Sequence, residues 1–262
     1  MIYAPAMGLG RRKVSIEDAS AWVFNRIADV YDARPDYPAP LIDALAELAG
    51  PAGSRVADLG AGIGHVALPL CARGLDVVAV EPALAMLDRL RRAAAHRGLA
   101  LRTVHGAAES LPFEPASIDL VIIADALHFM DAQLIGAEID RVLAPGGRLA
   151  LITCRPAPTP FMRDVVRAME QAVPRRPRAL AQNITHVSGM TGVALTDERQ
   201  FEDQTPVDLV TLDRILRSIS FIGPAMTAQR LAAFRQAVYA LSEAPVWART
   251  FALRSGRRSR SG

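Results

Sequence analysis

The sequence predicts an α/β fold built on a doubly wound, mostly parallel sheet. Short, continuously apolar segments alternate with segments whose apolar residues recur every three or four positions, which is the pattern of buried strands joined by crossover helices. A glycine-rich turn follows the first of these strands, and an acidic residue ends the second. Hydrophobic residues make up 51% of the 262-residue chain, which suits a sheet that is buried on both faces.

Two helices are predicted before the first strand. Apolar residues between Ile16 and Tyr31 occur mostly at three- and four-residue spacings, which predicts a helix with one apolar face. Pro35 and Pro38 end this helix, because proline lacks the N–H group that helix continuation needs. A second helix is predicted from Ala39 to Ala49.

Five short apolar segments then predict parallel strands with helices between them. The predicted strands are Arg55 to Leu59, Asp76 to Val80, Leu101 to Val104, Ile118 to Ile123 and Arg148 to Thr153. The predicted crossover helices are Val66 to Arg73, Ala83 to Arg97 and Leu134 to Leu143. A ligand is expected outside the carboxyl ends of such strands.

The alternation of strands and helices stops after Cys154. A long stretch with a helical pattern over Met162 to Ala172 precedes the next plausible strand. The last third of the chain predicts helices near Leu212 to Ser220 and Ala228 to Leu241, and a strand over Val246 to Leu253.

The turn after the first strand has glycines at alternate positions, Gly60, Gly62 and Gly64. Such glycines let the backbone turn sharply and approach a ligand, because a Cβ there would collide with the ligand or require a positive φ. A dinucleotide fingerprint would need its third glycine one position later, where this chain has His65. Glu81 ends the second strand, where a carboxylate can accept hydrogen bonds from both ribose hydroxyls. Together these features describe an adenosine site.

These motifs resemble the class I S-adenosylmethionine-dependent methyltransferases, and in particular a small-molecule, type 11-like methyltransferase domain. The resemblance covers roughly residues 20 to 155 and continues through Glu81-Pro82, GAAESLPF from Gly106, IDLVIIADALHFMD from Ile118 and EIDRVLAPGGRLALI from Glu138. It implies a seven-stranded Rossmann-like sheet of strand order 3-2-1-4-5-7-6, with an antiparallel last strand and a helical lid. It also implies S-adenosyl-L-methionine as cofactor and S-adenosyl-L-homocysteine as product.

We expect a single methyltransferase domain over residues 1–253. The resemblance suggests an amino-terminal helical lid over about residues 15–38 and an insertion after the fifth strand, over about residues 155–225, that helps to build the acceptor pocket. The last nine residues contain four arginines and no acid, and without those arginines the net charge falls from +3 to −1. We therefore interpret residues 254–262 as a basic, disordered tail and expect no nucleic-acid partner.

The resemblance implies which residues hold the cofactor beside the first two strands. Asp58 is expected near the methionine amino group, or else as a cap of the glycine turn. Glu81, with Pro82 after it, is expected at the ribose hydroxyls. The backbone expected against the cofactor is that of Gly60, Ala61 and Gly62.

The adenine side departs from the family pattern. Many relatives have an aspartate that accepts from the adenine amino group directly after the glycine of the GAAE stretch, where this chain has Ala107. The N–H of Ala108 can still reach a ring nitrogen. Glu109 is either a substitute acceptor or a cap of the following turn.

Four further candidates complete the expected site. Tyr31 and Arg34 resemble the amino-terminal segment that closes over the cofactor, and Arg34 suits the methionine carboxylate, unless it is only a surface residue after the helix. Asp125 either faces the methionine portion or caps its turn. His128 is the catalytic candidate, because imidazole can accept a proton near neutral pH; otherwise it packs in the pocket wall. No metal site is predicted.

The function expected from these residues is methyl transfer to a small, cyclic or aromatic metabolite by in-line displacement. The alternatives are a nicotinamide-dependent oxidoreductase, a catalytically silent cofactor-binding scaffold subunit, and an RNA or protein methyltransferase. The oxidoreductase is disfavoured because the chain lacks a catalytic Tyr-x-x-x-Lys pair. Lys13 is the sole lysine, and Leu9, rather than tyrosine, stands four residues before it.

No apolar run reaches the roughly 18 residues of a membrane span, so we expect a cytoplasmic bacterial protein with no membrane partner. The acceptor and the oligomeric state stay open.

Overall fold

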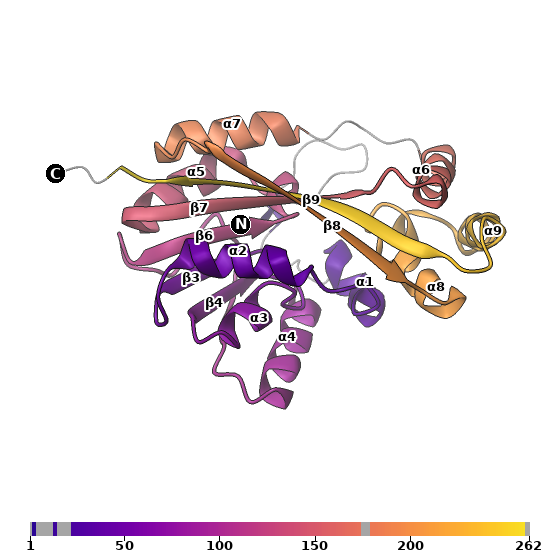
Figure 1. Cartoon of the computed structure of the whole chain (residues 1–262), viewed down its shortest axis with the longest axis horizontal. Coiled ribbons are helices and arrows are strands. Elements are labelled where there is room, and N and C mark those ends of the chain that lie inside the picture. The colour runs from indigo at the N-terminus through magenta and orange to yellow at the C-terminus, as the bar shows by residue number, and fades with distance from the viewer. Residues whose placement is uncertain (1, 4–12, 15–21, 174–178, 260–262) are drawn as a thin grey trace.

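The computed structural model describes residues 2–3, 13–14, 22–173 and 179–259. Its centre is a mixed seven-stranded sheet (Figure 1) with the spatial order β5-β4-β3-β6-β7-β9-β8. Counted along the chain, this confirms the predicted order 3-2-1-4-5-7-6. The last strand, β9, runs antiparallel to both of its neighbours, as predicted.

The strands of this sheet are β3 (Arg55–Leu59), β4 (Asp76–Glu81), β5 (Arg102–His105), β6 (Ile118–Ala124), β7 (Leu143–Pro156), β8 (Asp197–Pro206) and β9 (Val246–Arg257). Two short strands, β1 (Ile2–Tyr3) and β2 (Lys13–Val14), form a separate antiparallel pair.

The helices are α1 (Val23–Tyr31), α2 (Ala39–Ala49), α3 (Ala67–Cys71), α4 (Leu84–His96), α5 (Ala132–Val142), α6 (Pro160–Ala172), α7 (Leu180–Thr191), α8 (Leu209–Ser218) and α9 (Ala228–Tyr239). Single 3₁₀ turns occur at η2 (Leu127–Phe129) and η3 (Gly223–Ala225). Within the described ranges, none of these helices has the length and apolar character that crossing a membrane requires.

Alternate residues of the central strands point to opposite faces of the sheet and fill two apolar cores. Val56 and Val77 lie in one core with residues of α2, α3 and α4. Their neighbours Ala57 and Val78 lie in the other core with residues of α5 and α7. The continuous apolar runs of these strands are thus explained by burial on both faces.

The carboxy-terminal helices α6, α8 and α9 share a third core with Trp247 and Ala248 of β9. Figure 1 shows these three helices grouped at one end of the sheet, beside α1. They therefore build a separate wall next to the amino-terminal helix instead of covering a face of the parallel strands.

Side-chain caps set the start of four helices. Asp131, Thr159, Asp208 and Thr227 precede α5, α6, α8 and α9, and each accepts a hydrogen bond from a backbone N–H of the first turn. Such caps satisfy donors that have no partner within the helix. The bounds of α2 and β3 agree with the prediction, whereas residues 15–21 of the expected amino-terminal lid lie outside the described residues.

The stretch 155–225 is not one insertion, as the sequence suggested. It contains β8, a strand of the main sheet. The sequence hides this strand because it lies at the sheet edge and nearly all of its side chains are polar and exposed, so it lacks the apolar pattern of a buried strand. Helix α7 within the same stretch packs Val187 into the core beneath α5.

The interpretation of residues 254–262 as a disordered tail is wrong for residues 254–257. These residues form the end of β9, between β7 and β8. Arg254 forms an ion pair with Glu198 of β8, and Arg258 beyond the strand forms one with Asp140. Strand pairing with β7 and β8 thus orders residues 254–257, although their basic composition predicts a solvated segment. Residues 260–262 lie outside the described residues.

Candidate active site

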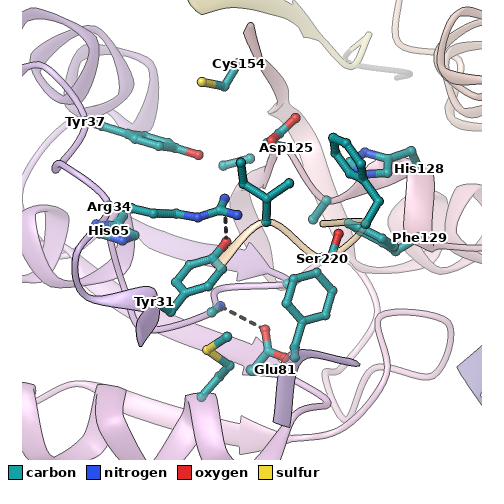
Figure 2. A pocket seen from close by; sticks show the side chains of 18 of the residues that line it. Tyr31, Arg34, Tyr37, His65, Glu81, Asp125, His128, Phe129, Cys154 and Ser220 are labelled. Atoms are coloured by element: carbon teal, nitrogen blue, oxygen red, sulfur yellow. Dashed lines mark hydrogen bonds between the residues drawn. The ribbon is translucent and has the colours of Figure 1, made fainter. Parts of the chain in front are cut away.

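A cavity of about 250 Å³ lies outside the carboxyl ends of the parallel strands, which is where a ligand was predicted. Gly60 after β3, Glu81 at the end of β4, Asp125 after β6 and Cys154 of β7 all line it. Figure 2 shows that residues of the amino-terminal segment, including Arg34, approach the same space from the opposite side.

The three glycines of the loop after β3 have different tasks, although all have positive φ. A Cβ on Gly60 would lie 2.8 Å from the Cβ of Ala126, and one on Gly64 would overlap Leu90. These two glycines are therefore required by protein packing. A Cβ on Gly62 would meet no protein atom within 4 Å, and Gly62 lines the cavity. Gly62 is thus the glycine that leaves room for a ligand.

Glu81 is buried in the cavity wall, with 5% of its surface exposed. Its two carboxylate oxygens accept hydrogen bonds of 2.8 Å from the N–H groups of Gly62 and Ala83. A carboxylate oxygen can accept twice, so each oxygen keeps capacity for one more donor. Burial raises the pKa of Glu81 to about 7, against the opposing effect of these two N–H groups.

Asp58 lies beneath the loop, 1% exposed, and is not among the residues that line the cavity. It accepts a hydrogen bond from the backbone of Ala67, the first residue of α3. Its Oδ1 is buried and has no hydrogen-bond partner among the described residues. This geometry favours the capping alternative, and a contact with the methionine amino group stays a prediction. Burial, together with the charge of Glu81, raises the pKa of Asp58 to about 7.

The raised pKa values of Asp58 and Glu81 predict a stability that falls as pH rises. Both groups hold protons in the folded protein at pH values where unfolded carboxyl groups, with pKa near 4, have lost them. Between about pH 4 and 7 the native state binds more protons than the unfolded state, so the free energy of unfolding decreases with pH. Carboxyl groups with a lowered pKa, such as Glu138 beside Arg141, titrate below this window.

We expect Asp58→Asn to flatten this decline between pH 5 and 7.5, because it removes one of the two titrating groups with a raised pKa. Calorimetric unfolding of the wild-type and variant proteins measures the two slopes. Equal slopes would show that the buried pair does not control the pH dependence.

The residues predicted to lie at the adenine follow β5. Ala107 and Ala108 are buried and line the cavity. Glu109 also lines it, and its Oε1 accepts a 2.9 Å hydrogen bond from the N–H of Asp131, the cap of α5. This contact favours the structural alternative for Glu109. Burial raises the pKa of Glu109.

Arg34 is not a surface residue after the helix, because it lines the cavity beside Tyr31. Its guanidinium lies 4.3 Å from the centre of the Tyr31 ring, and Nη1 donates a 3.3 Å hydrogen bond to the Tyr31 hydroxyl (Figure 2). Nε and Nη2 donate to the side chain and carbonyl of Ser218, each at 2.8 Å. A guanidinium has five N–H groups, so two remain for an anionic ligand. Burial is the main cause of the raised pKa of Tyr31.

Comparison with known proteins agrees with this arrangement. Residues 57–151 match a family model described as a methyltransferase domain. An uncharacterized methyltransferase of Mycobacterium tuberculosis is 42% identical over 146 residues, covering 56% of this chain and 55% of the relative. Residues 57–151 of the chain thus form a methyltransferase domain. The chain spans 55% of the length of the relative it matches.

Two solved structures share the fold of this methyltransferase chain. The YcgJ protein from Bacillus subtilis has a TM-score of 0.57 at 20% identity, covering 84% of this chain and 98% of that one. Geranyl diphosphate C-methyltransferase from Streptomyces coelicolor, in complex with Mg²⁺, geranyl diphosphate and S-adenosyl-L-homocysteine, has a TM-score of 0.50 at 15% identity. That match covers 84% of this chain and 78% of the other.

The methyltransferase candidates Asp125 and His128 lie together on the far side of the cavity from Arg34 (Figure 2). Asp125 has a φ of 48°, a left-handed conformation that costs about 1–3 kcal/mol in a residue with a side chain and concentrates at functional sites. Its N–H donates to the carbonyl of Ile152 at 2.8 Å. His128 lies on η2 with its ring 4.0 Å from that of Phe129, centre to centre.

Tyr37 lines the cavity although the sequence did not single it out. Its ring stacks on His65, with ring centres 6.1 Å apart and planes at 13°, and contacts Phe251. The preceding carbonyls of Pro35 and Asp36 accept hydrogen bonds from Arg249. Tyr37 is thus firmly held, and Figure 2 shows its hydroxyl directed into the cavity. Its place in the Arg34-Pro-Asp-Tyr-Pro38 turn was the available signal.

Other cavity residues carry no sequence signal. Met162 and Met169 of α6, Ile215 of α8 and Trp247 of β9 form an apolar wall. Cys154 also lines the cavity, and burial raises its pKa to about 12, so its thiol stays protonated at neutral pH and is a poor nucleophile. The apolar residues of this wall meet because α6 and α8 pack with β9 at one end of the sheet.

Proposed function

We propose that this protein transfers a methyl group from S-adenosyl-L-methionine to a small cyclic or aromatic metabolite by in-line displacement. The observation that carries the proposal is the composition of the cavity wall. Of the chain's eight phenylalanines, four tyrosines and two tryptophans, seven line this one cavity. Aromatic side chains present flat apolar faces, so a wall this rich in them suits a planar, apolar ligand.

The residues at one end of the cavity fit the cofactor. Gly62 leaves open space beside the backbone, and Glu81 has spare acceptor capacity for two ribose hydroxyls. Arg34 keeps two N–H groups for the methionine carboxylate. The bound cofactor would supply an electrophilic methyl group on a sulfonium. Family membership supports this assignment, and the contacts of the individual residues remain part of the proposal.

The residues at the other end suit an acceptor with an apolar body. Met162, Met169, Ile215 and Trp247 exclude water from that end, which matters because methyl transfer depends on alignment and on exclusion of competing water. An acceptor atom would give its electron pair to the methyl carbon while the carbon–sulfur bond breaks and its electrons stay on sulfur. We propose that His128 takes the proton that the acceptor loses.

Thermal unfolding with added ligands tests the proposed cofactor. S-adenosyl-L-homocysteine at 100 times its dissociation constant should stabilise the protein by about 2.7 kcal/mol, whereas NAD⁺ at the same concentration should not. Stabilisation by NAD⁺ alone would favour an oxidoreductase. The proposal of a class I cofactor would then fail.

A matched pair of acceptor probes tests the proposed substrate class. 2-Naphthol and the saturated alcohol 2-decalol share a carbon skeleton but differ in planarity. We expect the protein saturated with S-adenosyl-L-homocysteine to bind the naphthol more tightly in a calorimetric titration. Equal binding, or preference for the decalol, would contradict an aromatic acceptor. If the protein binds the cofactor but methylates none of a wider panel of candidate acceptors, the result would support the catalytically silent scaffold.

A further inference from the structure

Trp22 lies directly before α1 and has an unpaired indole N–H. The residue is 5% exposed and lines the cavity. Its Nε1 is buried and has no hydrogen-bond partner among residues 22–173 and 179–259. A buried donor without an acceptor is energetically costly, and such groups are uncommon unless a ligand or water satisfies them. An acceptor is therefore expected from a ligand at this point of the wall.

The surroundings of Trp22 place it at the adenine side. It packs with Ala83, Met86 and Ala107 in one buried cluster. Ala83 donates its N–H to Glu81, the carboxylate proposed to hold the ribose. Ala107 occupies the position at which many class I methyltransferases have an aspartate for the adenine amino group. The orphan donor thus lies beside the residue where the usual acceptor is missing.

An indole has different hydrogen-bonding chemistry from the aspartate that many relatives have in place of Ala107. An indole N–H can only donate, so it cannot accept from the 6-amino group of adenine. The ring nitrogens N1, N3 and N7 of adenine are acceptors and can pair with it. Ala107 has a small side chain and lies in the same buried cluster as the indole.

We propose that Trp22 is a specificity-determining residue for the cofactor, and that its indole N–H donates to a ring nitrogen of adenine. This inference rests on the proposed function. In this chain the indole N–H of Trp22 would then recognise adenine through one of its ring nitrogens. No acidic side chain after β5 would be needed to accept from the adenine amino group. Adenine binding and the position of the amino-terminal segment become linked through one side chain.

The test is a set of calorimetric titrations with S-adenosyl-L-homocysteine and its 1-deaza, 3-deaza and 7-deaza analogues. Each analogue replaces one ring nitrogen by a C–H group of nearly the same shape. In the wild-type protein, the analogue that lacks the contacted nitrogen should bind about three- to tenfold more weakly, the range expected for one neutral hydrogen bond. In Trp22→Phe, which keeps an aromatic ring but has no N–H, this difference should disappear.

Trp247→Phe is the matched control, because Trp247 is the chain's other tryptophan and lines the acceptor end of the same cavity. It should leave the pattern among the three analogues unchanged. A role of Trp22 in packing alone would weaken all four ligands by the same factor in Trp22→Phe, and that result would overturn the inference. Equal affinity of the wild-type protein for the parent compound and all three analogues would also overturn the inference. Failure of the wild-type protein to bind the parent compound would instead contradict the proposed function, and the inference with it.

Discussion

Replacement of Glu81 by alanine is expected to weaken binding of S-adenosyl-L-homocysteine by about 1.5–3 kcal/mol, or roughly 10- to 150-fold in dissociation constant. The reason is that Glu81 is a buried carboxylate with one spare acceptor position on each oxygen, and hydrogen bonds to a charged group are stronger than neutral ones. Isothermal titration at pH 8 measures the effect, because the pKa of Glu81 is raised to about 7 and the carboxylate is ionised there.

Asp76→Ala is the matched control for this prediction. Asp76 begins the strand that Glu81 ends, so it lies at the other end of β4 from the cavity. There it forms an ion pair with Arg102. The Asp76→Ala variant should bind S-adenosyl-L-homocysteine like the wild-type protein.

The affinity of the wild-type protein for this ligand should also increase as pH rises through about 7, because Glu81 then ionises. The Glu81→Gln variant should lose this pH dependence. A folded Glu81→Ala protein with unchanged affinity would remove the ribose assignment.

Replacement of His128 by alanine is expected to lower the turnover rate by about 10²-fold or more, the usual contribution of a positioned general base. His128 lines the cavity but is not among the residues proposed to hold the cofactor, so affinity for S-adenosyl-L-homocysteine should change little. Steady-state kinetics on the true acceptor, together with titration of the product, separate the two effects. His96→Asn, an exposed histidine in the last turn of α4, is the control.

Chemical rescue distinguishes a base from a wall residue. Added imidazole should restore part of the activity of His128→Ala, because it can occupy the vacated volume and accept the proton. His128→Asn keeps polarity but cannot accept a proton at neutral pH, and it should remain slow. Near-parental turnover of both variants would show that catalysis depends on alignment alone.

That Gly60, Gly62 and Glu81 line one cavity was predictable from sequence, because these residues are close to one another along the chain. The turn from Asp58 to Gly64 and the carboxylate of Glu81 follow adjacent parallel strands, and the carboxyl ends of such strands meet at one edge of the sheet. What the sequence left open, such as whether Asp58 caps the glycine turn or reaches a ligand, depends on which way one side chain points. Contacts from the neighbouring loop decide this.

The parts of the cavity wall outside this loop were not predictable in the same way, because their residues come from distant parts of the chain. Arg34 contacts Ser218, which lies 184 residues later. Trp22 shares a cluster with Ala107, although four helices and three strands separate them along the chain. An apolar residue at a helical spacing looks the same whether it faces a core or a cavity. The sequence pattern of α6 therefore predicts a buried face but not what lies against it.

The sequence by itself determined the fold class and, through family resemblance, the strand order. These depend on short-range patterns: apolar strands, positive-φ glycines and an acid at a strand end. Only the tertiary structure decided that polar β8 is an edge strand and that residues 254–257 are paired instead of disordered. It alone placed Trp22, Arg34 and the apolar residues of α6 and α8 around one cavity. The physical reason is that pairing partners and cavity walls are set by long-range packing, which local composition does not encode.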